Sequence, residues 1–326
     1  MHSGYYKNAF QAALLHGHEN IIELLLARGA DISITGGYYG NTLQIASLNN
    51  NQSFIELLLG RKADVNAQGG YFGNALQAAS YAGHKDTIEL LFRRGVNVNA
   101  EGGHYGNALQ AAAYNGHKDV VELLLYRGAG VNVQGGEYGN ALQATSCQGH
   151  KDIVELLLAE GARVDMQGGH YGNALQAASY GKYKNILENK SIVELLLTKG
   201  VDVNAQGGRY GNALQAASYT GHKKIVEMLV ENGAEVNVQG GEYGNALQAA
   251  SYGGHKKIVE MLVENGAEVN AQGGEYGNAL QAASFEGHRE IVEMLVENGA
   301  EVNAQGGRYG NALQAASYSC NKKIDC

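Results

Sequence analysis

Residues 74–106 read N-A-L-Q-A-A-S-Y-A-G-H-K-D-T-I-E-L-L-F-R-R-G-V-N-V-N-A-E-G-G-H-Y-G, and close variants of this stretch fill the chain. The opening asparagine of the stretch occurs at Asn8, Asn41, Asn74, Asn107, Asn140, Asn173, Asn212, Asn245, Asn278 and Asn311. Every interval is 33 residues except the one from Asn173 to Asn212, which is 39. A fixed period of this length indicates a repeat architecture in which each unit is one supersecondary element.

The repeating unit divides into two helices and a glycine-rich segment. Asn74 and Gln77 form an N-x-x-Q capping pattern that starts a first helix, and Gly83 ends this helix where a left-handed residue is needed. A second helix follows, with apolar residues at helical spacing on one side and charged residues on the other, and Gly95 closes it. Residues 98–106 are too rich in glycine for a helix and predict an extended finger with a turn at its tip.

The sequence therefore predicts an all-α repeat solenoid of about ten helix-turn-helix units, each with a β-turn finger, the first and the last unit being incomplete. We expect a single domain over residues 1–326, with a six-residue insertion near 181–190 in the turn between two helices. A surface loop is one prediction for this insertion. The alternative is that Ile186 and Leu187 extend a helix or contact a partner.

Some repeats are nearly identical to one another, and one repeat departs from the common pattern. Residues 221–253 and 254–286 match at 30 of 33 positions, which indicates a recent duplication. In the second unit, Asn50-Asn51 replaces Gly-His and Lys62 replaces the closing glycine. Because the position held by Lys62 favours glycine, we expect a locally weakened helix end there.

Composition excludes several classes of function. The chain has 47 glycines, no proline, no tryptophan and a net charge of −8, and this acidic balance argues against a nucleic-acid partner. Its three cysteines form no C-x-x-C pair, which fits a reducing compartment. No segment is long and apolar enough to predict a membrane span or a signal peptide. We therefore expect an intracellular, cytoplasmic protein, although the sequence is also compatible with a nuclear location.

The spacing, the Gly-His pair, the I-V-E-L-L-L helix and the G-A-D-V-N-A-type segment together resemble the ankyrin repeat over essentially the whole chain. The family's usual T-P-L-H opening is replaced by N-A-L-Q in most units, and its finger is replaced by the Gly-Gly-x-Tyr-Gly of residues 240–244. This variant is similar to arrays attached to many fungal proteins, including NACHT-type receptors. The resemblance implies that finger tips and first-helix ends face the concave side and make most contacts with a protein partner.

Three positions are kept in most units, which indicates that they form the framework. One is the Gln of each N-A-L-Q motif, for which we predict a hydrogen-bonded ladder between units. Another is the finger aromatic, as in Tyr105, for which packing between fingers is favoured over partner binding because Phe72 fills the place without a hydroxyl. The third is the histidine of the Gly-His turn, which we expect to stabilise the turn. Equivalent positions in stacked helices lie about 8–10 Å apart, too far for a shared metal with ligand bonds of roughly 2 Å.

Two positions vary and predict the partner-binding surface. Residues of every chemical class occur at the position after the double glycine. In chain order these residues are Tyr38, Tyr71, His104, Glu137, His170, Arg209, Glu242, Glu275 and Arg308. The end of the first helix is rich in aromatic residues, namely Tyr81, Tyr114, Tyr219, Tyr252 and Phe285. Tyrosine offers a large contact area with few rotatable bonds and so suits a recognition surface. Neutral variation at solvated positions is the alternative explanation.

A protein-binding module is the favoured function, either free-standing or as the sensing array of a larger receptor. The sequence contains no G-x-S-x-G, H-E-x-x-H or phosphate-binding loop, so we predict no catalytic residue, cofactor or metal. The alternatives are an enzyme that binds a small molecule in the groove and a self-assembling scaffold. The chain starts inside a finger and stops where a last second helix would begin at Lys322. Such ends fit an excerpt of a longer protein, a truncated product, or an array that associates end to end.

Overall fold

The computed structural model of the chain describes residues 8–32, 35–181 and 186–324. The chain divides into two compact units. Unit 1 comprises Met1–Thr145 with Asp152–Arg163, and unit 2 comprises Ser146–Lys151 with Val164–Cys326. Each unit is described by itself below.

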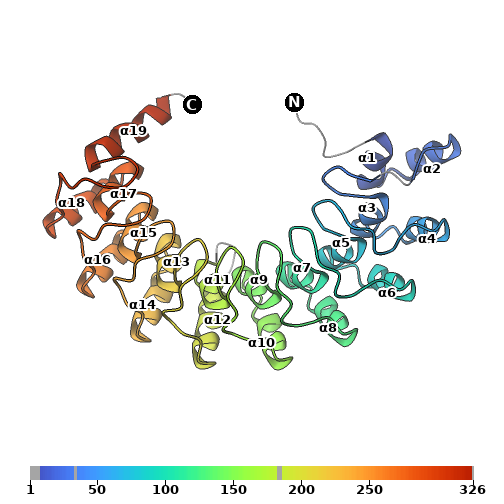
Figure 1. Cartoon of the computed structure of the whole chain (residues 1–326), viewed down its shortest axis with the longest axis horizontal. Coiled ribbons are helices and arrows are strands. Elements are labelled where there is room, and N and C mark those ends of the chain that lie inside the picture. The colour runs from blue at the N-terminus through green and yellow to red at the C-terminus, as the bar shows by residue number, and fades with distance from the viewer. Residues whose placement is uncertain (1–7, 33–34, 182–185, 325–326) are drawn as a thin grey trace. The chain divides into compact units, whose positions relative to one another are not determined.

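The described residues form nineteen α-helices and contain no β-strand beyond single bridges (Figure 1). In chain order these are α1 (Ala9–Leu15), α2 (Glu19–Ala27), α3 (Thr42–Leu48), α4 (Gln52–Gly60), α5 (Ala75–Ala82), α6 (Lys85–Arg93), α7 (Ala108–Asn115), α8 (Lys118–Tyr126), α9 (Ala141–Gln148), α10 (Lys151–Ala159), α11 (Ala174–Tyr180), α12 (Ile186–Thr198), α13 (Ala213–Thr220), α14 (Lys223–Glu231), α15 (Ala246–Gly253), α16 (Lys256–Glu264), α17 (Ala279–Glu286), α18 (Arg289–Glu297) and α19 (Ala312–Ile324). The predicted all-α repeat fold is confirmed.

Within each unit, odd-numbered first helices pack side by side and even-numbered second helices form a parallel row (Figure 1). Small side chains make the close packing of first helices possible. Ala78 and Ala79 of α5 are fully buried against the neighbouring first helices. Ile88 and Leu91 of α6 cover this layer and are also fully buried, so the core lies between the two rows.

The first helices begin at asparagine caps, as predicted. The Oδ1 atom of Asn74 accepts a hydrogen bond from the backbone N–H of Gln77 at 2.8 Å. The reciprocal bond, from the backbone N–H of the asparagine to the glutamine Oε1, is present at Asn41, Asn278 and Asn311. The bond from the glutamine N–H to the asparagine side chain is therefore the general rule, whereas the reciprocal bond of the predicted capping box is not. The glutamine amide has a further role.

The glutamine of each N-A-L-Q motif joins one repeat to the next. The Nε2 group of Gln248 donates to the backbone carbonyl oxygens of Ala271, Gly273 and Gly277 in the following finger, at 3.0, 3.3 and 2.7 Å. Gln77 in unit 1 and Gln215 in unit 2 bond their following fingers in the same way. The predicted glutamine ladder is confirmed, and the invariance of this residue follows because its amide satisfies carbonyl groups that helix and finger leave open.

The turn histidines also bridge repeats, a role beyond the local stabilisation that was predicted. The imidazole Nε2 of His117 lies 2.9 Å from the Tyr81 carbonyl oxygen at the end of the preceding first helix, and His255 contacts Tyr219 in the same way. In the repeat with the insertion, the buried Asn189 of α12 donates from Nδ2 to the Ser146 carbonyl oxygen at 3.4 Å. An amide thus replaces the imidazole where the Gly-His motif is missing.

The insertion and the last helix both differ from a plain repeat. The helix α12 begins at Ile186, so the alternative in which Ile186 and Leu187 extend a helix is confirmed, while residues 182–185 lie outside the described part. The expected second helix at Lys322 is wrong, because α19 continues without a turn to Ile324. The reason lies in the sequence. Cys320 occupies the place that Gly287 holds in the preceding repeat with a φ of 78°, and without glycine the helix does not end there.

Lys62 takes the backbone conformation of the glycine it replaces, with a φ of 65°. A side chain in this left-handed region costs about 1–2 kcal/mol, so the predicted weak helix end has a physical basis. We expect Lys62→Gly to raise the free energy of unfolding by about 1 kcal/mol in urea denaturation. The reverse change at the equivalent position, Gly95→Lys, should lower it by a similar amount because Gly95 has a φ of 80° and open space around it. Equal stability of Lys62→Gly and the unmodified chain would contradict this account.

Candidate partner-binding surface

The variable residue after the double glycine lies at the tip of each finger, and backbone hydrogen bonds join neighbouring tips into a ladder. In unit 1 the N–H groups of Tyr71, His104 and Glu137 each donate to the carbonyl oxygen of the preceding tip residue, at 2.7, 2.7 and 2.8 Å. In unit 2 the same bonds run through His170, Arg209, Glu242, Glu275 and Arg308 at 2.8–2.9 Å. We call these rows the tip ladders of unit 1 and unit 2. Each tip backbone is fixed, while its side chain can change freely.

The glycine before each tip allows neighbouring fingers to approach this closely. Gly103 has a φ of 64°, and a Cβ atom there would lie 2.4 Å from the backbone carbon of Phe72 and 2.5 Å from the nitrogen of Gly73. Gly241 in unit 2 is equally close to the backbone of Tyr210. Fixed glycine at this position therefore reflects contact between backbones of successive fingers.

The finger aromatics lie beneath the tips as a stack whose members are buried or half-buried. Phe72, Tyr105 and Tyr138 follow one another in unit 1 with ring centroids 6.4 and 6.0 Å apart. Tyr210 and Tyr243 in unit 2 are 6.4 Å apart and nearly parallel. Phe72 is 5% exposed and Tyr243 is 3% exposed, so the prediction that these rings serve packing is confirmed.

The aromatic residues at the first-helix ends fit between these rings. Tyr81 lies 5.1 Å from Phe72 and 5.0 Å from Tyr105, measured between ring centroids. Tyr219 lies 5.5 Å from Tyr210 and 4.7 Å from Tyr243 in unit 2. The two sets of rings therefore interlock, which is a packing role that spacing alone did not predict.

The structure distributes the predicted contact residues unevenly between surface and interior. The exposed ones are Glu137, Arg209 and Arg308. The half-buried ones are Tyr71, Tyr81, His104, Tyr114, His170, Tyr219, Glu242, Tyr252 and Glu275. Phe285 is buried at 8% exposure between Tyr276 and Tyr309, so we omit it from the surface proposed below. Its ring is part of the interlocked stack.

The two tip ladders differ in chemistry. In unit 1 the rings of Tyr38, Tyr71 and His104 stack with centroid distances of 4.7 Å at both steps. In unit 2 the guanidinium group of Arg209 pairs with Glu242, and that of Arg308 donates to Glu275 at 2.7 Å. These pairs join residues 33 positions apart. Opposite charges separated by one repeat are the feature of the sequence from which the pairs could have been predicted. The tip ladder of unit 1 thus contains a row of three rings, and the tip ladder of unit 2 contains two ion pairs.

Burial shapes the acid–base chemistry of this face. Burial raises the pKa of Tyr105, Tyr210 and Tyr243, and hydrogen bonds with neighbouring tyrosines raise it further. The pKa of His104 is lowered by burial, which outweighs the opposite effect of Glu137. Cys147 takes the place of an aromatic residue in the helix-end row, and burial raises the pKa of its thiol to about 11. A thiol with this pKa is poorly suited to act as a nucleophile.

Alkaline pH should destabilise the interlocked tyrosines. Because the fold raises the phenol pKa above its unfolded value of about 10, the stabilising contribution is complete below pH 10 and is lost as pH rises further. We expect the melting temperature to fall as pH rises from about 10 to about 12, while the phenolate absorbance increases over the same range. Tyr243→Phe should weaken this pH dependence, since Phe72 shows that a phenyl ring fits the position. An unchanged pH dependence in Tyr243→Phe would contradict the assignment.

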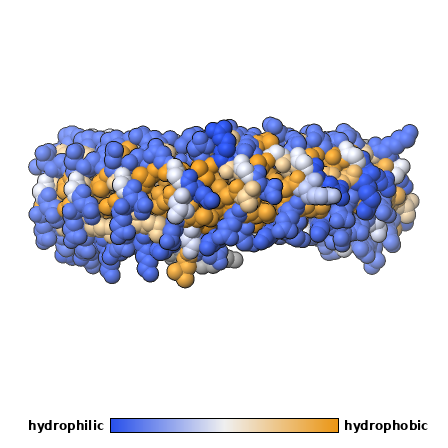
Figure 2. Space-filling view, turned by 90° about the horizontal axis from the view of Figure 1, so that it is seen from below, coloured by the Kyte–Doolittle hydropathy of each residue, from blue (hydrophilic) through white to orange (hydrophobic). Residues whose placement is uncertain are grey.

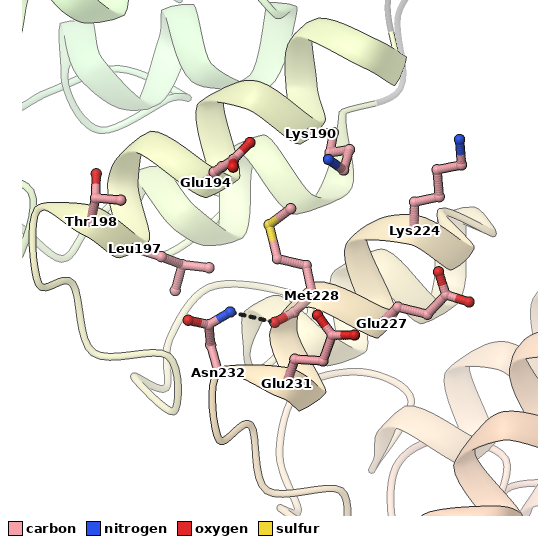
Figure 3. Close-up of a pocket in the computed structure, with 9 residues that line it drawn as sticks. All are labelled: Lys190, Glu194, Leu197, Thr198, Lys224, Glu227, Met228, Glu231 and Asn232. Carbon is pink, nitrogen blue, oxygen red and sulfur yellow. Dashed lines mark hydrogen bonds between the residues drawn. The ribbon is translucent and has the colours of Figure 1, made fainter.

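The opposite side of each unit is formed by the second helices. Figure 2 shows this face with apolar residues in a band between two hydrophilic edges. In unit 2 a groove of about 700 Å³ lies between α12 and α14, with Leu197 and Met228 directed into it and Lys190, Glu194 and Lys224 around it (Figure 3). Its nine lining residues are mostly charged or polar and include Thr198, Glu227 and Glu231.

Two further observations concern chemistry that the described residues could support. No three His, Cys, Asp or Glu side chains in that part of the chain gather so that they could hold a metal ion. No helix there combines the length and the apolar character needed to cross a bilayer.

Stacked helix pairs, bridged by fingers and carrying variable residues on a fixed ladder, define a helical repeat protein of the binding-scaffold class. The family model for ankyrin repeats in three copies matches residues 43–135, 109–207, 142–240, 186–273 and 241–306, and the single ankyrin-repeat model matches residues 7–36. The chain belongs to the ankyrin-repeat family. Ankyrin repeats are generally protein–protein interaction modules and are typically not enzymes.

Solved structures agree on the fold. The chain is similar to the crystal structure of the human ASB11 ankyrin repeat domain, with 21% sequence identity and a TM-score of 0.54. The similarity covers 68% of this chain and 96% of that one. A comparison with curated proteins gave no significant match.

Proposed function

We propose that the chain binds protein through the tip ladder of each unit together with the half-buried tyrosines at the first-helix ends of that unit. One observation carries this proposal. Each tip contributes its backbone to a hydrogen-bonded row, whereas its side chain is tyrosine, histidine, glutamate or arginine from one repeat to the next. A fixed frame with changing side chains is what a recognition surface requires, because rigid presentation lowers the entropy cost of binding.

We place this partner inside the cell. Cys147 is a free, buried thiol, as expected of a protein kept in a reducing compartment. The chain's net charge of −8 also favours a partner with a neutral or basic contact surface over nucleic acid.

Capture from a cell extract with matched variants tests the proposal. The first variant combines Tyr71→Ala and Arg209→Ala, one tip from each ladder. The control combines Lys224→Ala and Glu260→Ala, which are exposed positions on the second-helix face. We expect the partner retained by the unmodified chain to be lost from the tip variant and kept by the control, with circular dichroism confirming that both are folded. Retention by the tip variant together with loss from the control would refute the proposed surface.

A further inference from the structure

The tip ladder of unit 1 has a spacing that few peptide conformations match. Tyr38, Tyr71 and His104 follow one another with ring centroids 4.7 Å apart at each step, so two steps span at most 9.4 Å. A polyproline II helix has three residues per turn and rises about 3.1 Å per residue, giving roughly 9.3 Å per turn. Residues one turn apart in such a helix would therefore lie over the first and third rings of the row.

Other conformations fit this row less well. An extended strand repeats its same-side residues at about 6.8 Å, and an α-helix has a pitch of about 5.4 Å, so both lose register with the tips within two steps. Strand addition along the row is also unfavourable. The N–H and C=O groups of the tips already bond to one another, as in the bonds from Tyr71 to Tyr38 and from His104 to Tyr71. The ligand must therefore be recognised through side chains.

The exposed parts of the stacked rings suit a polyproline backbone. Tyr71 has Tyr38 on one face and His104 on the other, and it meets Phe72 and Tyr105 at nearly right angles. The half-buried Tyr71 ring therefore presents the outer part of its edge, and not its faces, to a ligand. Ring edges carry partial positive charge, and a polyproline II segment has carbonyl groups that make no internal hydrogen bonds. Tyr71 of the row and the half-buried tyrosines at the helix ends, Tyr81 and Tyr114, pack against the same buried cluster, which includes Phe72 and Tyr105.

A charged residue at one end of the ring row distinguishes the two directions in which a ligand could lie on it. The tip after His104 is Glu137, whose N–H donates to the His104 carbonyl oxygen and whose side chain is exposed. A basic side chain on the ligand, one step beyond the ring row, would complement the charge of Glu137.

From this spacing and charge pattern we infer that the tip ladder of unit 1 binds a proline-rich segment in polyproline II conformation that carries a basic residue at its Glu137 end. The inference rests on the proposed function and specifies the partner's chemistry. The ring row fixes the conformation of the ligand, and Glu137 fixes which end carries the positive charge.

Synthetic peptides on the full chain test this inference by fluorescence anisotropy. The probe is a labelled ten-residue peptide of prolines with one terminal arginine. The comparisons are the same peptide with glutamine for arginine and a glycine–serine peptide that keeps the arginine. We expect the glycine–serine peptide to bind at least about tenfold more weakly, because it lacks the preformed helix. Replacing the arginine should weaken binding by about threefold, as for an exposed ion pair.

Variants of the chain complete the test. His104→Ala, at the third ring of the row, should weaken binding of the proline peptide about tenfold or more, as for an interface anchor. Glu137→Gln, an exposed change that leaves the rings in place, should abolish the preference for arginine. Glu242→Gln, at the equivalent tip in unit 2, should leave both peptides unaffected. Equal binding of the glycine–serine peptide, or an arginine preference that survives Glu137→Gln, would overturn the inference. If the peptides fail while tip substitutions still abolish partner capture, only the ligand class is wrong.

Discussion

Gly241→Ala is expected to lower the free energy of unfolding by about 4 kcal/mol, because a methyl group there collides with the backbone of the preceding finger. The added Cβ atom would lie 2.4 Å from the Tyr210 carbonyl carbon and 2.5 Å from the Gly211 nitrogen. Neither backbone atom can rotate away, so the fingers must separate. Separation breaks the bond of 2.8 Å from the Glu242 N–H to the Arg209 carbonyl oxygen.

A matched variant separates this collision from ordinary backbone strain. Gly233 also has a left-handed backbone, with a φ of 87°, but nothing lies within 4 Å of a Cβ atom placed there. Gly233→Ala should therefore cost only about 1–2 kcal/mol. Urea denaturation measures both losses, and hydrogen exchange at the Glu242 amide reports finger separation directly. Equal losses in the two variants would show that close approach between fingers contributes nothing.

Gln248→Glu is expected to cost about 3–5 kcal/mol at neutral pH, since it puts a carboxylate where three carbonyl oxygens need a donor. Gln248 is 1% exposed, and its Nε2 group donates to Ala271, Gly273 and Gly277. Glutamate has nearly the same size, so the loss reports hydrogen bonding and charge rather than a cavity.

The pH dependence of this variant gives a second readout. Burial against carbonyl oxygens should raise the pKa of the new carboxyl group above its unfolded value of about 4.3. The raised pKa means that the protonated form, which can donate one hydrogen bond, is favoured in the fold. The deficit should therefore shrink as pH falls towards 4 and grow as pH rises. Gln305→Glu, at an exposed finger position, is the control and should change stability little. A deficit in Gln248→Glu that does not change with pH would contradict this account.

Much of the fold could be predicted because the local rules and the repeat agree. Asn74 with Gln77 marks a helix start, Gly83 marks its end, and the structure has both. The framework role of Gln77 followed from its invariance among repeats. Its bonding partners could not be predicted, because they depend on where the next finger lies.

The candidate surface was less predictable, since it depends on distances between repeats. Spacing placed Tyr81 and Phe285 in one equivalent series, but Tyr81 is half-buried and Phe285 is buried. The separation of 4.7 Å between Tyr71 and His104 follows from finger backbones in contact at Gly103. Stacked helices alone would indicate about 8–10 Å. Pairing of Arg209 with Glu242 follows from the same short spacing.

The short rung of the tip ladder has a consequence for how such a chain can diversify. A ligand whose turn spans two rungs contacts every second repeat. Any two of its contacts are therefore separated by an even number of rungs. Insertion of a single repeat inside the ladder of unit 1 would displace every later contact by half a ligand turn. Insertion of two repeats would restore the phase and lengthen the ladder by one full turn. Duplication of two repeats together should therefore preserve ligand binding, whereas duplication of a single repeat should abolish it.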